Sequence, residues 1–234
     1  MPRILSSVKQ LVVPHSRAPR RIRTGPFRGL RMDLDLSTQT QLYIGMFERE
    51  VYHWLERLSV GIGSAVDIGA REGEYTLYFL AKTSARQVVS FEPYPAIHPR
   101  LISNLELNEL SDDPRWTLVS SYVGTRDGDG ECTLDSLLPS LETKTPCLIK
   151  IDVDGGEVAI LQGARRLLES HQGRWIIETH SQALETQCVR MLQDSGYTTR
   201  IIPNAWWRLF LPELRESELI HFNRWLAAAA DGSL

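Results

Sequence analysis

Residues 65–76 and 148–157 share one pattern, and this pattern constrains the fold more than any other feature of the sequence. In each segment, an apolar run typical of a buried parallel strand leads to an acidic residue, a glycine turn and the start of a helix. Such strands form open α/β sheets, in which ligands bind just outside the carboxyl ends of the strands. The acidic residues and glycines of both segments are therefore predicted to line one binding site.

The length and composition agree with a single α/β domain. The chain has 234 residues, of which 42% are apolar, and this is enough to bury a core of its own. Its apolar runs are strand-sized, so we predict neither a transmembrane helix, which needs roughly 20 apolar residues, nor a secretory signal. Three widely spaced cysteines without a CxxC pair indicate reduced thiols in a cytoplasmic protein: Cys132, Cys147 and Cys188.

Positive charge is concentrated at the start of the chain. Residues 1–31 hold eight Lys and Arg residues and no acidic residue, whereas the rest of the chain carries 18 basic and 29 acidic side chains. We interpret residues 1–24 as a basic, flexible leader, with an organellar transit peptide as an alternative. A basic arm can also contact nucleic acid or anionic lipid, but no interleaved aromatic residues support RNA stacking here.

Strand and helix patterns alternate after the leader. A lead-in over 25–60 contains a hairpin within 22–36 and a helix over 38–58. Strands are predicted at 64–68, 87–91, 116–123, 147–151 and 174–177, and helices at 74–83, 96–110, 134–141, 157–170 and 183–194.

The end of the chain is predicted to close the sheet. The short Pro203-Asn204 link favours antiparallel pairing of 197–202 with 207–211. The whole order predicts an α/β, Rossmann-like class I methyltransferase fold with a mostly parallel seven-stranded sheet and a C-terminal antiparallel hairpin. This domain would cover residues 25–211, and a C-terminal helix at 221–230 and a tail would occupy 212–234.

The turn after the first strand has the form G-x-x-x-G, unlike the G-x-G-x-x-G of dinucleotide sites. Gly69 and Gly73 let the backbone pass close to a ligand, and a helix that begins near Glu74 can hold a carboxylate at its N-terminus. Glu92 ends the next strand, where an acidic residue can accept hydrogen bonds from both ribose hydroxyls. We therefore predict S-adenosylmethionine as the cofactor.

Neighbouring residues complete the predicted cofactor site. Asp67 or Glu72 can approach the ammonium group of the methionine tail, and the end of the third strand around Ser121 can border the adenine. The predicted cofactor-binding residues are Asp67, Gly69, Ala70, Glu72, Gly73, Tyr75, Thr76, Glu92, Pro93 and Ser121.

The ends of the fourth and fifth strands carry the candidate catalytic residues Asp152, Glu178 and His180. Methyl transfer to a hydroxyl needs an aligned oxygen and a base for its proton. His180 is the best base by its ordinary pKa, since a histidine is largely neutral near pH 7. Glu178, two residues earlier, is predicted to point to the same side, while Asp152 can orient the acceptor or polarise a histidine.

Other interpretations of these residues stay open. Asp152 and Glu178 can instead hold a divalent metal ion such as Mg²⁺, which would lower the pKa of the acceptor hydroxyl. Asp154 and Glu157 can cap the following helix, and Lys150 can pair with Asp152 on one strand face.

On these motifs, the chain resembles the FkbM family of S-adenosylmethionine-dependent methyltransferases over residues 25–200. The segments that carry the resemblance are VDIGAREGEYT (66–76), FEPYP (91–95), TLDSLL (133–138), IKIDVDGGE (149–157), LQGA (161–164) and IETH (177–180). The resemblance implies a Rossmann-like methyltransferase fold and methylation of a hydroxyl on a sugar or polyketide-type product. The chain departs from the family pattern at Asp154, where Glu is usual, and at Arg71, where Asn is common.

The predicted function is O-methylation of a sugar, glycan or secondary metabolite. A nucleic-acid methyltransferase that uses the basic arm, an NAD-dependent oxidoreductase and a non-catalytic binding module are the alternatives, and homo-oligomers are compatible with each. The segment after Asp152 lacks the Asp/Asn-Pro-Pro-aromatic signature of adenine amino methylation, and a G-x-G-x-x-G turn is missing.

Overall fold

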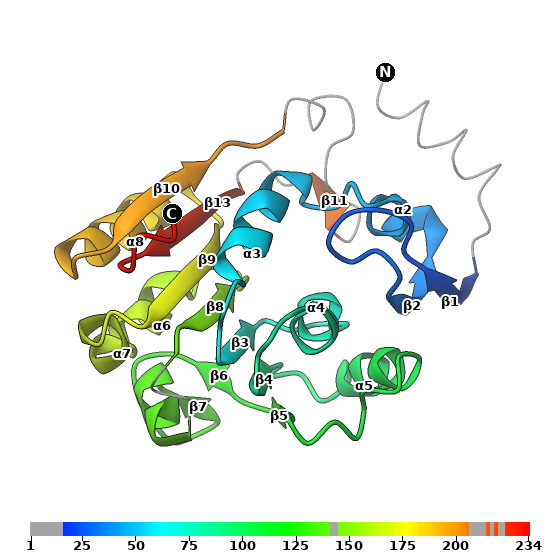
Figure 1. Ribbon diagram of the computed structural model, residues 1–234, viewed down its shortest axis with the longest axis horizontal. Helices are drawn as coiled ribbons and strands as arrows, with labels where there is room; N and C mark the ends of the chain where they lie inside the picture. Colours follow the sequence, from blue (N-terminus) through cyan, green and yellow to red (C-terminus); the bar gives the residue numbers. More distant parts are fainter. Residues whose placement is uncertain (1–15, 141–144, 206–213, 216–217, 220–222) are drawn as a thin grey trace.

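Seven strands form the central sheet of the computed structural model, which describes residues 16–140, 145–205, 214–215, 218–219 and 223–234. Their order across the sheet is β10-β13-β9-β8-β3-β4-β5 (Figure 1). The strands are β3 (Ser64–Ile68), β4 (Gln87–Phe91), β5 (Trp116–Val119), β8 (Cys147–Ile151), β9 (Gly173–Thr179), β10 (Thr198–Ile202) and β13 (Arg224–Ala229). The five strands from β5 to β9 are parallel, and β13 runs antiparallel to both β9 and β10. The predicted fold is confirmed.

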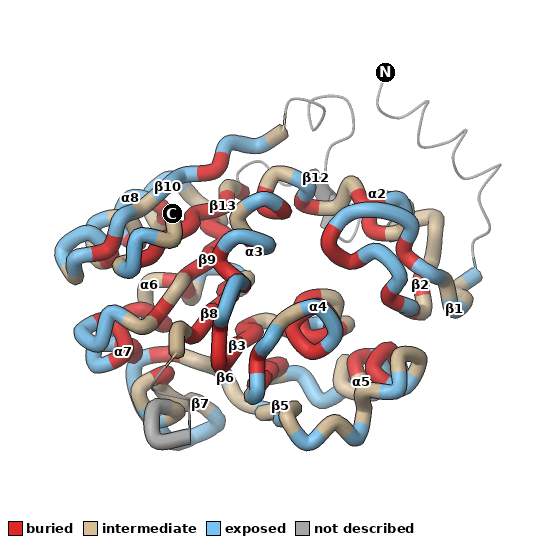
Figure 2. Tube along the Cα trace, in the orientation of Figure 1, coloured by how far each residue is buried: buried red, intermediate tan, exposed pale blue. Residues whose placement is uncertain are grey.

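Helices cover both faces of this sheet (Figure 1). They are α2 (Leu36–Ile44), α3 (Tyr52–Leu58), α4 (Glu74–Lys82), α5 (His98–Glu106), α6 (Glu157–Gln162), α7 (Arg165–Glu169) and α8 (Gln182–Asp194), with 3₁₀ turns η1 (Arg49–Val51) and η2 (Leu134–Ser140). Successive strand residues pack to opposite sides, so Leu148 joins the core under α2–α5 and Ile149 the core under α6–α8. Figure 2 shows the buried strands between these two layers.

The lead-in region contains a two-stranded hairpin. β1 (Arg17–Arg21) pairs antiparallel with β2 (Arg31–Asp35), so a hairpin forms as predicted, but its first strand lies before residue 22, in the predicted leader. The prediction of a flexible leader is wrong for residues 16–24, because the apolar side of the hairpin is anchored in the core; residues 1–15 lie outside the described residues. Phe27 provides the anchor, since its buried ring packs edge-on against three tyrosines: Tyr52, Tyr75 and Tyr78.

Two predicted helices are interrupted. The helix expected over 38–58 breaks at Gly45, which caps α2 with φ +73°, and a side chain there would collide with the backbone of Thr24. The helix expected over 157–170 is divided into α6 and α7. The carboxylate of Asp135 accepts the backbone N–H groups of Arg166 (3.0 Å) and Leu167 (3.1 Å), so a second helix start is stabilised from a distant loop.

The predicted third strand, 116–123, is also divided. β5 ends at Val119, and β6 (Tyr122–Val123) leaves the main sheet to pair with β7 (Glu131–Cys132).

The closing hairpin uses a different second strand from the predicted one. The expected strand 207–211 lies outside the described residues, and β13 occupies the position between β10 and β9. The prediction of a C-terminal helix at 221–230 is wrong for Arg224–Ala229, whose apolar run is buried as a strand within the sheet. The sheet domain therefore extends beyond residue 211. Nearby, β11 (Leu214–Arg215) pairs with β12 (Glu218–Leu219). None of the helices in the described residues has the length and apolarity needed to span a membrane.

Candidate functional site

A cavity of about 560 Å³ lies at the carboxyl ends of β3, β4 and β8. This is the edge of an open α/β sheet at which ligands bind. The residues that line it include Gly69, Arg71, Glu92, Tyr94, Ser121 and Asp152. The structure therefore joins the ends of three predicted strands around one space.

The carboxylate of Glu92 is fixed in the wall of this cavity. Its side chain lies at the end of β4, and the residue is only 2% exposed. One oxygen accepts the backbone N–H of Arg71 at 3.0 Å, and the other accepts the backbone N–H of Tyr94 at 3.0 Å. Because a carboxylate offers about four acceptor positions, Glu92 keeps capacity for a ligand diol.

The glycine turn brings two strand ends together. Gly69 has φ +77°, and a Cβ atom at this position would collide with the backbone carbonyl oxygen of Asp152. The backbone N–H groups of Gly69 and Ala70 both donate to the carbonyl of Phe91, at 3.0 and 2.9 Å. Glycine at 69 is therefore required by the approach of β8 to β3.

Two predicted cofactor residues, Asp67 and Thr76, form a buried network behind the cavity. The Thr76 hydroxyl donates to Asp67 at 2.7 Å and lies 2.7 Å from the Ser90 hydroxyl. The Trp116 indole N–H donates to Ser90 at 3.1 Å. Neither Asp67 nor Thr76 lines the cavity, and these contacts hold β3, β4 and α4 together.

Glu72 faces the lead-in hairpin instead of the cavity. It accepts hydrogen bonds from Arg17 at 2.6 Å and from Gln39 at 2.9 Å, and Arg100 lies 3.3 Å away. Burial raises the pKa of Glu72, but the hydrogen bonds and positive charge of Arg17 outweigh it and hold this pKa below its ordinary value. The carboxylate is therefore charged and occupied by the hairpin.

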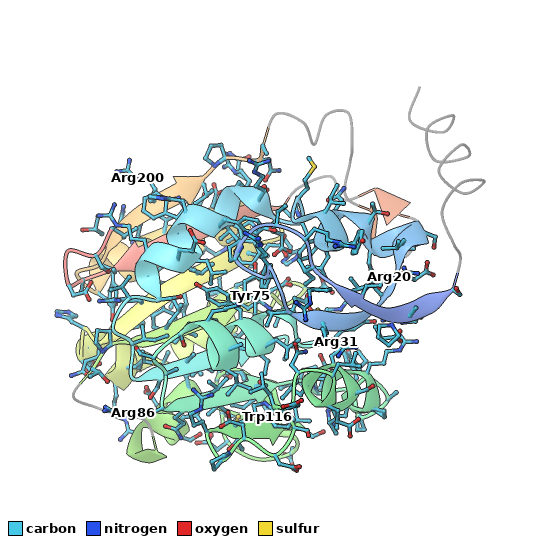
Figure 3. All side chains as sticks on the ribbon, turned by 45° about the vertical axis from the view of Figure 1, so that its right-hand side comes forward. Arg20, Arg31, Tyr75, Arg86, Trp116 and Arg200 are labelled. Atoms are coloured by element: carbon cyan, nitrogen blue, oxygen red, sulfur yellow. The ribbon has the colours of Figure 1, made fainter. Side chains whose placement is uncertain are left out.

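Tyr75 is also buried, in the first turn of α4 after Gly73 (Figure 3). Its hydroxyl donates to the carboxylate of Glu48 at 2.5 Å. Burial and then the charge of Glu48 raise the pKa of Tyr75 well above its ordinary value, so it stays a neutral donor. Cofactor contact by Gly73 and Tyr75 stays a prediction, because neither residue lines the cavity.

Lys150 connects the glycine turn to the candidate catalytic residues. Its ammonium donates to the Gly69 carbonyl at 3.0 Å and lies 3.3 Å from Asp67 and 3.7 Å from Asp152. The ammonium also lies 5.0 Å from the centre of the Tyr75 ring. Burial opposes its charge, but the carboxylates raise the pKa of Lys150 above its ordinary value. The predicted pairing with Asp152 is one part of this larger contact set.

Asp152, Glu178 and His180 come together as the sequence indicated. The Nδ1 atom of His180 donates to Glu157 at 2.7 Å, which directs Nε2 toward the strand ends. Nε2 lies 3.4 Å from Glu178, 3.6 Å from Asp154 and 3.8 Å from Asp152. Four carboxylates therefore surround one imidazole.

These four carboxylates change the protonation state expected for His180. Burial lowers the pKa of His180, but hydrogen bonds to Glu157 and Glu178 and the nearby charges raise it to about 10. The ring is thus an imidazolium near pH 7, whereas the sequence suggested a neutral base. Burial and the charge of Asp152 raise the pKa of Glu178 to about 8.

Asn223 is a member of this cluster that sequence reasoning missed. Its side-chain amide donates to Glu178 at 2.8 Å, and it precedes β13 directly. The sequence offered no signal for this contact, because it requires β13 to lie beside β9. Ligand atoms of Asp152, Glu178 and His180 lie within 4.8 Å of one another, and a divalent cation that bound there would displace the proton on Nε2 of His180.

Two tyrosines form the rim of the cavity near the predicted adenine position. Tyr94 and Tyr122 are 56% and 53% exposed, and their rings meet edge-to-face at 6.0 Å. Ser121, which also lines the cavity with Pro93, donates to the Gly130 carbonyl at 2.9 Å. Two exposed aromatic faces are thus available to a planar ligand group.

Comparisons with known proteins agree with this geometry. The methyltransferase FkbM domain model matches residues 130–202. A comparison with curated proteins gave no significant match. Among solved structures, methyltransferase FkbM from Methylobacillus flagellatus KT is similar with a TM-score of 0.55 and 18% identity, over 78% of this chain and 51% of that one. The chain thus spans about half the length of that protein.

Two further structures share the fold. The precorrin-6y C5,15-methyltransferase from Geobacter metallireducens GS-15 has a TM-score of 0.50 and 18% identity, over 75% of this chain and 83% of its own. The putative methyltransferase yhhF from Escherichia coli has a TM-score of 0.50 and 15% identity, over 91% of this chain and 98% of its own. The match over residues 130–202 agrees with the resemblance seen in the motifs of that segment, and these structures confirm the fold.

Proposed function

We propose that this chain, whose residues 130–202 match the FkbM methyltransferase domain, transfers a methyl group from S-adenosylmethionine to a hydroxyl of a sugar, glycan or secondary metabolite. One observation carries the proposal: Glu92, whose carboxylate is fixed by two backbone N–H groups, and Asp152 line a single cavity. Glu92 suits the ribose of the cofactor, and Asp152 suits an acceptor hydroxyl.

The cofactor is assigned to the side of the cavity formed by β3 and β4. Glu92 would accept hydrogen bonds from the ribose hydroxyls, and Tyr94 and Tyr122 would border the adenine. The turn from Gly69 to Gly73 leads into α4, whose N-terminal N–H groups favour the carboxylate of the methionine tail. S-adenosylmethionine supplies the reactive methyl group on a positively charged sulfur.

Asp152 is the proposed base. It lines the cavity, whereas Glu178 and His180 do not, so Asp152 is the member of the cluster that can reach an acceptor. Asp152 would accept the proton of the acceptor hydroxyl as its oxygen is methylated, and S-adenosylmethionine would supply the methyl group and leave as S-adenosylhomocysteine. Glu178 and His180 act as positioning residues, and the His180 imidazolium balances the negative charge around Asp152.

A divalent cation is a second way to activate the hydroxyl. The ligand atoms of Asp152, Glu178 and His180 are close enough to bind one ion together once His180 has released its proton, and this ion would lower the pKa of a bound hydroxyl. Methyl transfer measured with EDTA and with added Mg²⁺ separates the two routes. Full activity in EDTA would leave Asp152 as the base, and activity that depends on Mg²⁺ would assign the cluster to the metal.

Calorimetric titration with S-adenosylhomocysteine and with NAD tests the proposal. We expect binding of S-adenosylhomocysteine alone, weakened in Glu92→Ala and unchanged in Glu106→Ala, an exposed glutamate on α5. Binding of NAD would favour the alternative function of an oxidoreductase. Failure to bind either ligand would contradict the enzyme proposal and favour a binding module.

A further inference from the structure

We propose that the β1–β2 hairpin is a docking surface for an anionic glycan, which carries the hydroxyl to be methylated. This inference rests on the proposed methyl transfer, because it names the chemistry of the acceptor. Residues 16–35 hold six arginines and two acidic residues, Asp33 and Asp35. The whole chain has a formal net charge of −3, so the hairpin is a positive region on an otherwise acidic protein.

Both acidic residues of the hairpin are already engaged. Asp33 pairs with Arg17 at 3.2 Å, and Asp35 accepts the backbone N–H of Ser37 at 2.8 Å. Arg20 and Arg23 donate to uncharged oxygens, a backbone carbonyl and a tyrosine hydroxyl. Within the described part of the chain, five hairpin arginines have no ion pair: Arg20, Arg21, Arg23, Arg28 and Arg31.

Two of these arginines lie directly opposite each other. Arg21 pairs with Arg31 in the register of β1 and β2, and both residues are exposed. Like charges at opposing positions of an antiparallel pair are destabilising. A bound anion relieves this repulsion, so the pair favours a negatively charged ligand. Figure 3 shows Arg20 and Arg31 on the hairpin, away from Arg86 and Arg200.

The other end of the hairpin is attached next to the cavity. Arg17 donates to Glu72 at 2.6 Å, and Glu72 directly follows Arg71, which lines the cavity. Arg100 of α5 contacts the same carboxylate at 3.3 Å. A chain-like ligand held on Arg21 and Arg31 is therefore led along the hairpin toward the site.

The aromatic residues of the hairpin distinguish a glycan from a single-stranded nucleic acid. Residues 16–35 contain one aromatic residue, Phe27, and its side chain is fully buried. Single-stranded nucleic acids are held by exposed aromatic rings on which the bases stack, together with positive charge. The hairpin offers charge without such rings, which fits sulfate, phosphate or carboxylate groups on sugars.

Fluorescence anisotropy with three labelled probes tests this surface: a sulfated oligosaccharide, a single-stranded RNA of equal charge and a neutral dextran oligosaccharide. We expect the sulfated probe to bind most tightly and to weaken with salt. The double variant Arg21→Ser/Arg31→Ser should bind the sulfated probe about tenfold more weakly. The slope of its log affinity against log salt concentration should correspond to roughly two fewer charge contacts. The matched control Arg86→Ser/Arg200→Ser, with exposed arginines outside the hairpin, should bind within about twofold of the wild type.

Three outcomes would overturn the inference: no binding of the sulfated probe, equal losses in the two double variants, or tighter binding of the RNA. Thermal unfolding of each variant shows whether it is folded. Calorimetry with S-adenosylhomocysteine on the same proteins keeps the two proposals apart. Retained cofactor binding with no glycan binding contradicts only the docking surface, whereas absent cofactor binding in the wild type contradicts the proposed function.

Discussion

The backbone carbonyl oxygen of Asp152 occupies the space that a Cβ atom on residue 69 would need. The proposed cofactor turn and the proposed base are therefore fitted to each other through the main chain. Lys150 strengthens the same junction, because its ammonium contacts the Gly69 carbonyl and both Asp67 and Asp152.

Gly69→Ala should destabilise the protein by at least about 2 kcal/mol and weaken S-adenosylhomocysteine binding. The new methyl group collides with backbone, and φ +77° is strained for alanine. Gly61→Ala is the matched control, since residue 61 has a φ of +69° but a Cβ atom there would meet open space. This substitution should lower the free energy of unfolding by only about 1 kcal/mol. Urea unfolding measures both changes, and equal costs would contradict the close approach to Asp152.

Lys150→Met should lower the free energy of unfolding by about 3–5 kcal/mol, because it leaves the buried carboxylate of Asp67 and the partly buried carboxylate of Asp152 without their shared cation. Lys82→Met, at an exposed lysine, should stay within about 0.5 kcal/mol of the wild type. The double variant Asp67→Asn/Lys150→Met should recover part of the loss. If it recovers nothing, the ion pair is not the reason for the destabilisation.

The stability of the protein should fall as the pH rises above neutrality. The pKa of His180 is raised from 6.5 to about 10, so its contribution is complete below pH 6.5 and is lost as the pH rises through 10. The pKa of Glu178 is raised from 4.5 to about 8, so folding favours its protonated form, and this contribution is lost as the pH rises toward 8.

Thermal unfolding between pH 6 and pH 10 checks this dependence. His180→Gln should flatten the decline in Tm, whereas His53→Gln, at an exposed histidine, should leave the decline in place. A wild-type Tm that rises over this range would contradict the imidazolium assignment.

Asp152→Asn should lower kcat by about 10²–10⁴-fold and change the Kd of S-adenosylhomocysteine by little, because the base acts on the acceptor proton. Asp154→Asn is the matched control, because Asp154 also lines the cavity but its side chain is 73% exposed. This substitution should lower kcat by less than about tenfold. Steady-state kinetics with an acceptor found by screening gives both values. Comparable losses in the two variants would argue against Asp152 as the specific base.

Several parts of the fold were predictable because local patterns determine them. Ser64–Ile68, Gln87–Phe91 and Cys147–Ile151 form strands with the predicted bounds, since each is a short apolar run that ends at a polar or turn segment. The parallel order of these strands also follows from the helices between them. Glu92 and Asp152 were therefore predicted at one edge, and the structure places both in one cavity.

Other parts depend on partners that are distant in the sequence. The apolar run Arg224–Ala229 is compatible with a helix or a strand, and pairing with β9 and β10 decides between them. The start of α7 depends on the carboxylate of Asp135, which lies in η2, about 30 residues earlier in the sequence. Periodicity describes one segment at a time, so it carries no information about such partners.

The sequence by itself determined which chemical groups stand at the strand ends: Glu92 after β4, Asp152 after β8 and His180 after β9. Only the tertiary structure decided which of them face the cavity and which are protonated. Glu72 turns to Arg17, and His180 becomes an imidazolium because Glu157 and Glu178 surround it. Burial and neighbouring charges set these states, and both are produced when distant segments pack together.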